Sequence, residues 1–337
     1  MKYVFGVSSH LAFYLCHKLI QVDAICADDC IFFTTRDYMF PAEYQSVYTH
    51  VIRTSYNTSS TSGRIFAGWK FWDTRKNIRA FDALVDRQIK GEPFLWYTQV
   101  CFNDICSLMV TKRNCVGYYV IEDGSGSYKT ENPSTFKGVK SIIYHILLKP
   151  LYPRLFVLKN RMIETNHSKF KGCIASNDMC FPLHQQYTRV IGLPFIPVPL
   201  AERPDAILSV DPMFLWISLE EAHLVIQQLA SYINAKQYKR IAYKHHPYNL
   251  SKTNHHIYEQ YNMWLHQYIS AKLDELDAQV SLENTLMAHT CDFYTAVSCV
   301  AIYAKALICE CYSYMPLLRP YTTLSVPVVE NLCTPIE

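Results

Sequence analysis

The chain has 337 residues, of which 50% are hydrophobic and 18% charged, and its formal net charge is +3. This composition excludes a disordered chain and disfavours a nucleic-acid-binding protein, while the length is typical of two domains of about 150 residues each. Polar residues interrupt the N-terminus too soon for a signal peptide, and no run of about 18 apolar residues occurs. We therefore expect a cytoplasmic protein without a membrane span, whose 13 cysteines are reduced core thiols.

In the first half of the chain, short apolar runs alternate with amphipathic segments. This order predicts an α/β domain with a parallel sheet and right-handed crossovers. Ser8 and Ser9 are expected to cap the first helix, and they stand where a dinucleotide-binding fold has its glycines, so we predict no nicotinamide or flavin site. Predicted strands span residues 3–7, 30–35, 47–54, 93–100 and 116–123, and predicted helices span residues 10–21, 78–90 and 103–112.

The strand predicted at 116–123 ends at two adjacent carboxylates, Glu122 and Asp123, and a turn that begins with Gly124 and Ser125 follows. In open α/β sheets ligands bind beyond the carboxyl ends of the strands, where a carboxylate can take a proton from a bound hydroxyl. The alternative is a turn in which Asp123 only caps the backbone. The sequence does not decide between the two acids as the base, although Asp123 lies nearer the turn.

Two further segments of the first half are candidate contact surfaces. Residues 56–63 are rich in Asn, Ser and Thr and predict either a sugar-contacting loop or a plain surface loop. Between residues 137 and 171, eight basic side chains are opposed by Glu164 alone, next to apolar residues. Such a strip predicts peripheral contact with the anionic inner face of the cytoplasmic membrane, with solvated charge at a domain edge as the alternative.

A cluster of glycine and proline residues marks the predicted domain boundary. Gly192 and the prolines at 194, 197, 199 and 204 end regular structure and stiffen the chain. We predict an N-terminal domain at 1–190, a linker at 191–205, a C-terminal nucleotide-binding domain at 206–315, and a tail at 316–337 that can pack back on the N-terminal domain.

The second half repeats the alternation. Three of its strand-to-helix turns carry His246-Pro247, Glu283 and Ser298. If these strands are neighbours in a parallel sheet, the three side chains project into one crevice of nucleotide size. Predicted strands span residues 206–210, 240–244, 278–282, 293–297 and 308–311, and predicted helices span residues 218–236, 258–276 and 300–307.

Each of these residue types suits one part of a nucleotide. Glu283 can accept hydrogen bonds from ribose hydroxyls, and Ser298 with the following helix N-terminus can hold a phosphate. His246 can donate a proton or hydrogen bond to a departing phosphate oxygen, and Pro247 would fix its turn. The plain alternatives are a turn histidine, a helix N-terminal charge and an ordinary N-cap serine.

The order of these motifs, Glu122-Asp123-Gly124, then His246-Pro247, then an acid and a serine, resembles the bacterial sialyltransferases. That resemblance implies two Rossmann-like domains of the GT-B type facing each other across a cleft. Carried over, Glu122 or Asp123 is the general base and His246 acts on the CMP phosphate. Glu283 then binds the cytidine ribose and Ser298 the phosphate, whereas Cys299 stands where the family has Ser or Thr. Further candidate substrate contacts are Ser8, Ser9, Gly124, Ser125, Lys244 and Pro247.

The activity implied by the resemblance is an inverting transfer of sialic acid, or a related nonulosonic acid, from its CMP-activated form to a sugar hydroxyl. The acceptor implied is galactose of a bacterial surface glycan such as lipopolysaccharide or capsule. The CMP-sugar is a co-substrate, and no metal or other cofactor is required.

Three alternatives remain open at this stage. One is a transferase for another CMP-linked acid (pseudaminic, legionaminic or Kdo) or for a nucleotide-diphosphate sugar. Another is a non-catalytic glycan-binding protein. The third is a metal site formed by His245, His246, His255 and His256, which the missing CxxC pairs disfavour.

Overall fold

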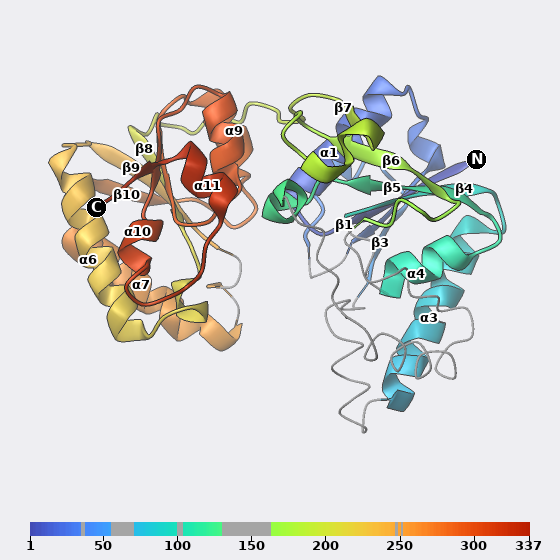
Figure 1. The fold of residues 1–337 in the computed structure, drawn as a ribbon, viewed down its shortest axis with the longest axis horizontal. Helices are drawn as coiled ribbons and strands as arrows, with labels where there is room; N and C mark the ends of the chain where they lie inside the picture. Colours follow the sequence, from blue (N-terminus) through green and yellow to red (C-terminus); the bar gives the residue numbers. More distant parts are fainter. Residues whose placement is uncertain (35–37, 55–70, 100–103, 130–162, 247–248, 251) are drawn as a thin grey trace. The chain divides into compact units, whose positions relative to one another are not determined.

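The computed structural model describes residues 1–34, 38–54, 71–99, 104–129, 163–246, 249–250 and 252–337 (Figure 1). The chain divides into two compact units, Met1–Pro194 and Phe195–Glu337, and the boundary falls within the segment predicted as a linker. In the described part of the chain, no helix combines the length and the apolar character that a membrane crossing requires.

The first unit is built on a seven-stranded sheet whose paired strands all run parallel. Its order is β3-β2-β1-β4-β5-β6-β7. Successive strands are added on one side of β1 up to β3 and on its other side from β4 onward, so the strand order reverses between β1 and β4. Such a reversal is the place where doubly wound sheets bind ligands. The strands are β1 (Lys2–Val7), β2 (Cys30–Thr34), β3 (Val51–Arg53), β4 (Phe94–Thr98), β5 (Cys115–Ile121), β6 (Phe170–Ala175) and β7 (Thr188–Val190).

Helices cover both faces of this sheet, with α1 on one side and α3 and α4 on the other (Figure 1). Helix α1 begins where the sequence predicts, because the Ser9 Oγ accepts a hydrogen bond from the Ala12 N–H at 3.3 Å. The strand predicted at 47–54 is only three residues long. The helices of the first unit are α1 (His10–Val22), α3 (Phe71–Ile89) and α4 (Asp104–Thr111), with 3-10 turns η1 (Ala27–Asp29), η2 (Ala42–Tyr44), η4 (Gly124–Tyr128) and η5 (Pro182–Tyr187).

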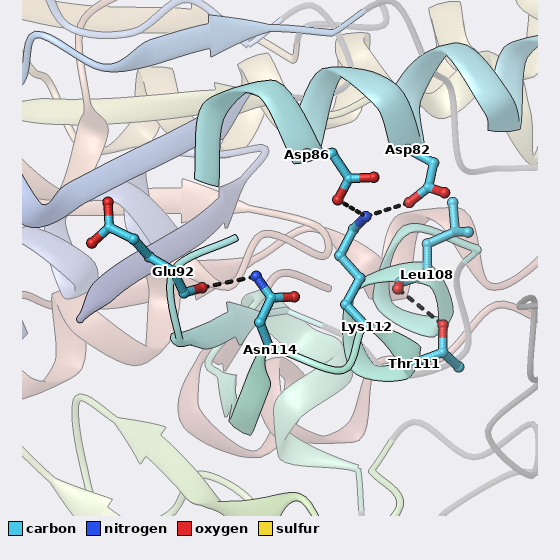
Figure 2. Close-up of polar contacts among 7 residues, drawn as sticks. All are labelled: Asp82, Asp86, Glu92, Leu108, Thr111, Lys112 and Asn114. Atoms are coloured by element: carbon cyan, nitrogen blue, oxygen red, sulfur yellow. Dashed lines mark hydrogen bonds and ion pairs between the residues drawn. The ribbon is translucent and has the colours of Figure 1, made fainter. Parts of the chain in front are cut away.

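A buried ion pair joins α3 to the end of α4 (Figure 2). The Lys112 Nζ lies 2.5 Å from Asp82 Oδ1 and 2.7 Å from Asp86 Oδ1, and the side chains of Lys112 and Asp82 are only 3% and 4% exposed. A buried lysine is tolerated only when its charge is compensated in this way. The pair therefore fixes the packing of these two helices beneath the sheet.

The second unit is built on a six-stranded parallel sheet of order β10-β9-β8-β11-β12-β13. Neighbouring residues of β8 enter different cores, since Leu208 packs with α6 and α7 whereas Ile207 packs with α8 and α9. This alternation shows that helices bury both faces of the sheet. The strands are β8 (Ala206–Val210), β9 (Arg240–His245), β10 (Lys272–Glu275), β11 (Asp292–Thr295), β12 (Cys311–Ser313) and β13 (Thr334–Pro335).

Helix α6 begins within one residue of its predicted start, where Ser218 and Glu221 form a reciprocal capping box. The helices of the second unit are α6 (Leu219–Ala235), α7 (His255–Tyr268), α8 (Leu282–Ala288), α9 (Val300–Ala306), α10 (Met315–Leu318) and α11 (Pro327–Leu332), with 3-10 turns η6 (Met213–Leu215) and η7 (Lys252–Asn254).

Several predicted boundaries in this unit differ from the structure, including the strand predicted at 308–311, where β12 spans Cys311–Ser313. The helix predicted to reach residue 276 ends at Tyr268, and β10 follows it at 272–275. The strand predicted at 278–282 is instead the approach to α8, because the Ser281 Oγ accepts the Asn284 N–H and starts a helix. An alternating apolar pattern over five residues fits a strand or the entry to a helix equally well.

The segment 316–337, predicted as a C-terminal tail, belongs to the second compact unit. It supplies α11 and the edge strand β13. Leu318 and Ile336 are buried in the same core as α6, and Val329 is buried in the core of α8 and α9.

Candidate functional site

The ends of β1, β4 and β5 meet at the reversal point of the first sheet and carry a hydrogen-bonded polar chain. Ser8 follows β1, Gln99 follows β4, and Glu122 and Asp123 follow β5. The Ser8 Oγ lies 2.6 Å from Gln99 Oε1, and the Gln99 Nε2 donates to Asp123 Oδ1 at 2.9 Å. The predicted acids and the predicted serines are thus brought together, and Gln99 joins them.

Glu122 is fully buried and holds the structure together. Its Oε1 accepts a hydrogen bond from the Tyr128 hydroxyl, and its Oε2 accepts the backbone N–H of Ser176 at 2.7 Å. Asn177 Nδ2 in turn donates to the Tyr128 oxygen at 2.7 Å. A carboxylate with 0% exposure and both oxygens engaged joins the ends of β5 and β6 and is poorly placed to meet a substrate.

Asp123 differs from its neighbour because it is only half-buried. Its N–H donates to the Ser127 Oγ at 2.8 Å, and Gln99 orients its carboxylate. Gly124 follows with a φ of 57°, a conformation that glycine adopts without strain, and begins the turn η4. Of the two acids, Asp123 is therefore the more accessible to a bound molecule. Ser125 lies in the same turn.

The second sheet has its own buried acid at its reversal point, between β8 and β11. Asp211 follows β8 directly and is 1% exposed. Its Oδ2 accepts hydrogen bonds from Thr295 Oγ1 at 2.9 Å and from the Ala296 N–H at 2.7 Å, and lies 3.0 Å from the Tyr314 hydroxyl. Burial and the Asp211 charge raise the pKa of Tyr314, which keeps this phenol protonated. Asp211 thereby fixes the turn between β11 and α9.

The paired histidines at the end of β9 have separate roles. His245 is 1% exposed; its Nε2 pairs with Asn262 Oδ1 at 2.8 Å and its Nδ1 with Asn249 Nδ2 at 3.3 Å. An amide oxygen only accepts and an amide NH₂ only donates, so this histidine is a neutral imidazole with its proton on Nε2. Burial lowers the pKa of His245, against the opposing effects of the Asn262 hydrogen bond and the Glu275 charge. His245 is a core residue.

His246 is half-buried, and its N–H donates to the carbonyl of Val210, which places it beside the end of β8. Burial lowers the pKa of His246, the Asp211 carboxylate opposes this shift, and the Lys244 cation adds to it. An imidazole balanced between these charges is suited to proton transfer. Pro247 lies outside the described residues.

Glu283 does not end a strand as predicted but lies in the first turn of α8, where Ser281 Oγ donates to its Oε2 at 2.7 Å. It still follows β10, so it belongs to the same edge of the sheet as His246. The Lys244 ammonium donates to the Val280 carbonyl; burial lowers the pKa of Lys244, while Glu283 and Asp277 raise it. Lys244 and Glu283 are therefore electrostatic neighbours.

Ser298 and Cys299 start α9. The Ser298 N–H donates to Thr295 Oγ1 at 2.9 Å, and its Oγ accepts the Val300 N–H at 3.3 Å. Cys299 occupies the N-cap position without a side-chain capping bond. The strands that precede His246 and Ser298 are not direct neighbours, because β8 lies between β9 and β11. The intervening strand brings Asp211 between them.

Other candidate regions contribute less. The sugar-contacting loop at 56–63 and most of the basic strip, up to residue 162, lie outside the described residues. In the described end of the strip, the Lys169 Nζ donates to the carbonyls of Val110 and Lys112 at 2.7 and 2.8 Å, so it caps α4. No cluster of three or more His, Cys, Asp or Glu side chains that could hold a metal occurs in the described part.

A groove of about 590 Å³ in the second unit lies at the amino ends of the strands, opposite the candidate residues. Its walls include Asp205, Lys239 and Asp292, which precede or begin β8, β9 and β11. The candidate residues follow the other ends of these strands, and ligands of parallel sheets bind at the carboxyl ends.

No family model matches the sequence, and no curated protein matches it. Solved structures do. The structure of MnaA from S. aureus with UDP aligns with 93% of this chain and 79% of its own, at 12% identity and a TM-score of 0.53. The UDP-GlcNAc 2-epimerase of Methanocaldococcus jannaschii aligns with 100% of this chain and 89% of its own, at 12% identity and a TM-score of 0.52.

The fold is of the GT-B type. The predicted class, α/β with two Rossmann-like domains, is confirmed, and each domain has its own parallel sheet with a reversal point. At such low sequence identity, the likeness establishes the architecture and leaves the chemistry to the residues themselves.

Sequence reasoning missed Gln99 and Asp211. Asp211 directly follows the all-buried strand β8, as Asp123 and its neighbour follow β5. The same pattern of an acid at a strand end was the available signal. Gln99 carried no such signal, because a single amide after a strand is common in turns.

Proposed function

We propose that the protein is an inverting glycosyltransferase that moves sialic acid, or a related nonulosonic acid, from a CMP-activated donor to a sugar hydroxyl. The observation that carries the proposal is the pair of residue types found at the carboxyl ends of the strands in the two sheets. The first sheet ends in a half-buried carboxylate, Asp123, and the second ends in a half-buried histidine, His246. The order of these residues along the chain supports the same assignment.

In this mechanism Asp123 acts on the acceptor. Its carboxylate removes the proton of the acceptor hydroxyl as the acceptor oxygen forms a bond to the anomeric carbon of the donor sugar. The bond from that carbon to the CMP phosphate oxygen breaks, and the electron pair leaves with the phosphate. A carboxylate oriented by a neutral amide suits this role, because the amide favours the ionised form without adding a competing charge.

His246 acts on the donor. It donates a hydrogen bond or a proton to the departing phosphate oxygen, where negative charge develops. Asp211 favours the protonated imidazole and Lys244 disfavours it. Ser298, at the start of α9, is the proposed phosphate contact, and Glu283 is the proposed ribose contact. The mechanism requires no metal, since the leaving group is already a stabilised anion.

A second candidate is an enzyme that acts on a UDP-sugar. It is favoured by the fold of the M. jannaschii protein, whose name states that it is a UDP-GlcNAc 2-epimerase, and by that of S. aureus MnaA, solved with UDP. Peripheral binding to the inner membrane surface remains a separate proposal, resting on the basic residues between 137 and 171.

Nucleotide selectivity tests the two candidates. CMP, CDP, UDP, CMP-sialic acid and UDP-GlcNAc are titrated against the protein by calorimetry, with Mg²⁺ and with EDTA. Selective binding of the cytidine monophosphate compounds in EDTA is expected. Selective binding of UDP would refute the CMP proposal and favour the second candidate.

Turnover then tests the residues. With CMP-sialic acid and a galactose-terminated acceptor, His246→Ala is expected to lower kcat by about 10²- to 10⁴-fold, because general acid catalysis contributes on that order. The matched control is His266→Ala, which removes another histidine of the same domain, on α7. Near-normal turnover of the His246 variant would refute its assignment.

A further inference from the structure

Gln99 is a polar side chain held in a defined orientation at the centre of the first domain's site. It follows β4, which lies between β1 and β5 in the sheet, and it is 8% exposed. Its side chain bridges the ends of the two neighbouring strands, with Ser8 on one side and Asp123 on the other. A bridge across a reversal point lies directly beneath the place where a ligand binds.

The direction of each hydrogen bond in the bridge is determined by chemistry. A carboxylate accepts only, so the amide nitrogen of Gln99 must face Asp123 Oδ1, at 2.9 Å. The amide oxygen then faces Ser8 Oγ at 2.6 Å, and the Ser8 hydroxyl must donate to it. The Gln99 Nε2 also lies 3.4 Å from the Oγ of Ser9, which caps α1. The amide is therefore held by β1 and the start of α1.

The groups around Asp123 determine how strongly the Gln99 amide affects the ionisation of the Asp123 carboxylate. The turn itself contributes two titratable side chains, Glu122 and Tyr128, which are bonded to each other. The loop before η5 contributes Cys180, whose pKa is raised by burial and by the Glu122 charge. The ends of β1 and α1 contribute the neutral hydroxyls of Ser8 and Ser9. A neutral donor beside an ionised acid, in a site that already holds one buried carboxylate, favours the anion.

We propose that Gln99 is a positioning residue for the base, which fixes the rotamer of the Asp123 carboxylate and keeps it ionised. This inference rests on the proposed function, because it presupposes that Asp123 removes the acceptor proton. Gln99 itself transfers no proton, and its effect reaches the substrate through Asp123.

The decisive variant is Gln99→Glu, which keeps the length of the side chain and replaces the donor with a second carboxylate. Two carboxylates at hydrogen-bond distance cannot both ionise readily. The acidic limb of the kcat/KM profile is expected to move to higher pH by about one unit or more, since like charges in one site shift titrations by that order. Gln45→Glu is the matched control, because Gln45 is an exposed glutamine of the same domain, hydrogen-bonded to the Phe40 carbonyl.

A purely structural role for Gln99 would lower stability in the Gln99→Glu variant and leave the acidic limb where it is in the wild type, which would overturn the proposal. Gln99→Ala separates the two effects further. It is expected to lower kcat by about tenfold with a smaller shift of the limb, because it removes the donor without adding a charge.

A readout that needs no turnover keeps this inference distinct from the proposed function. The Asp123 carboxyl carbon is titrated by NMR, and its signal is assigned by its loss in Asp123→Asn. The positioning role is supported if the midpoint of the Asp123 titration is higher in Gln99→Glu than in the wild type and is unchanged in Gln45→Glu. This result counts even if the wild type transfers no sugar. An unchanged midpoint overturns it. Full turnover by Asp123→Asn would instead refute the proposed function.

Discussion

Glu122 and Asp123 are adjacent acids that differ in burial, and we propose different roles for them that substitutions should separate. Glu122→Ala removes the acceptor of the Tyr128 hydroxyl and of the Ser176 N–H. Hydrogen bonds to charged groups contribute about 1.5–3 kcal/mol each, and the variant recovers part of this because it no longer buries a charge. We expect a loss of about 3 kcal/mol, which lowers the Tm of a unit of this size by about 6–12 °C.

Glu122→Gln provides the graded comparison. The amide oxygen can still accept the Ser176 N–H, and the amide nitrogen can donate to the Tyr128 oxygen, so we expect a loss of about 1 kcal/mol. Asp123→Asn keeps an acceptor for Gln99 and is only half-buried in the wild type, so its stability should change by less than about 1 kcal/mol. Its turnover should fall by about 10²- to 10⁴-fold, as expected for the loss of a general base.

The assay combines thermal melting by circular dichroism with initial rates of transfer, measured on the same preparations. The expected pattern is a low Tm for Glu122→Ala and a wild-type Tm with lost turnover for Asp123→Asn. The opposite pattern, in which Glu122→Gln melts like the wild type without turnover and Asp123→Asn remains active, would refute the assignment of the base.

Three other measurements address the buried charges and histidines. Lys112→Met should destabilise the first unit by about 3–5 kcal/mol, because the buried Asp82 carboxylate loses the Lys112 cation, and adding Asp82→Leu should recover most of that loss in urea melts. Asp211→Ala should destabilise the second unit by about 3 kcal/mol against about 1 kcal/mol for Thr295→Val, since the first removes the acceptor of several buried donors and the second removes one donor; equal losses would contradict the central role of Asp211. The pKa of His245 is lower in the folded state than its ordinary value of 6.5. The contribution of His245 to stability is therefore fully present above pH 6.5 and is lost as the pH falls below that value. The urea midpoint should decline from pH 7.5 to pH 5.5, and it should decline less steeply in His245→Gln.

The alternation of strands and helices could be predicted from the sequence because it depends on local patterns. Ser9 and Ser218 mark the starts of α1 and α6, since capping requires only a side-chain oxygen within three residues of the backbone N–H that it accepts. The strand that ends at Glu122 and Asp123 was equally readable, because its apolar run stops at those charges. Element boundaries failed where an alternating segment led into a helix, as before α8.

The organisation of the two sites was decided by tertiary structure. Gln99 meets Ser8 across 91 positions of sequence, and Asp211 meets Thr295 across 84, so no local pattern reports either contact. The strand order places β8 between β9 and β11 and so brings Asp211 to the reversal point. The sequence by itself determined which residue types end the strands. Their burial, and with it the difference between a structural Glu122 and an accessible Asp123, follows only from what the folded sheets pack around them, because burial is a property of neighbours far apart in the chain.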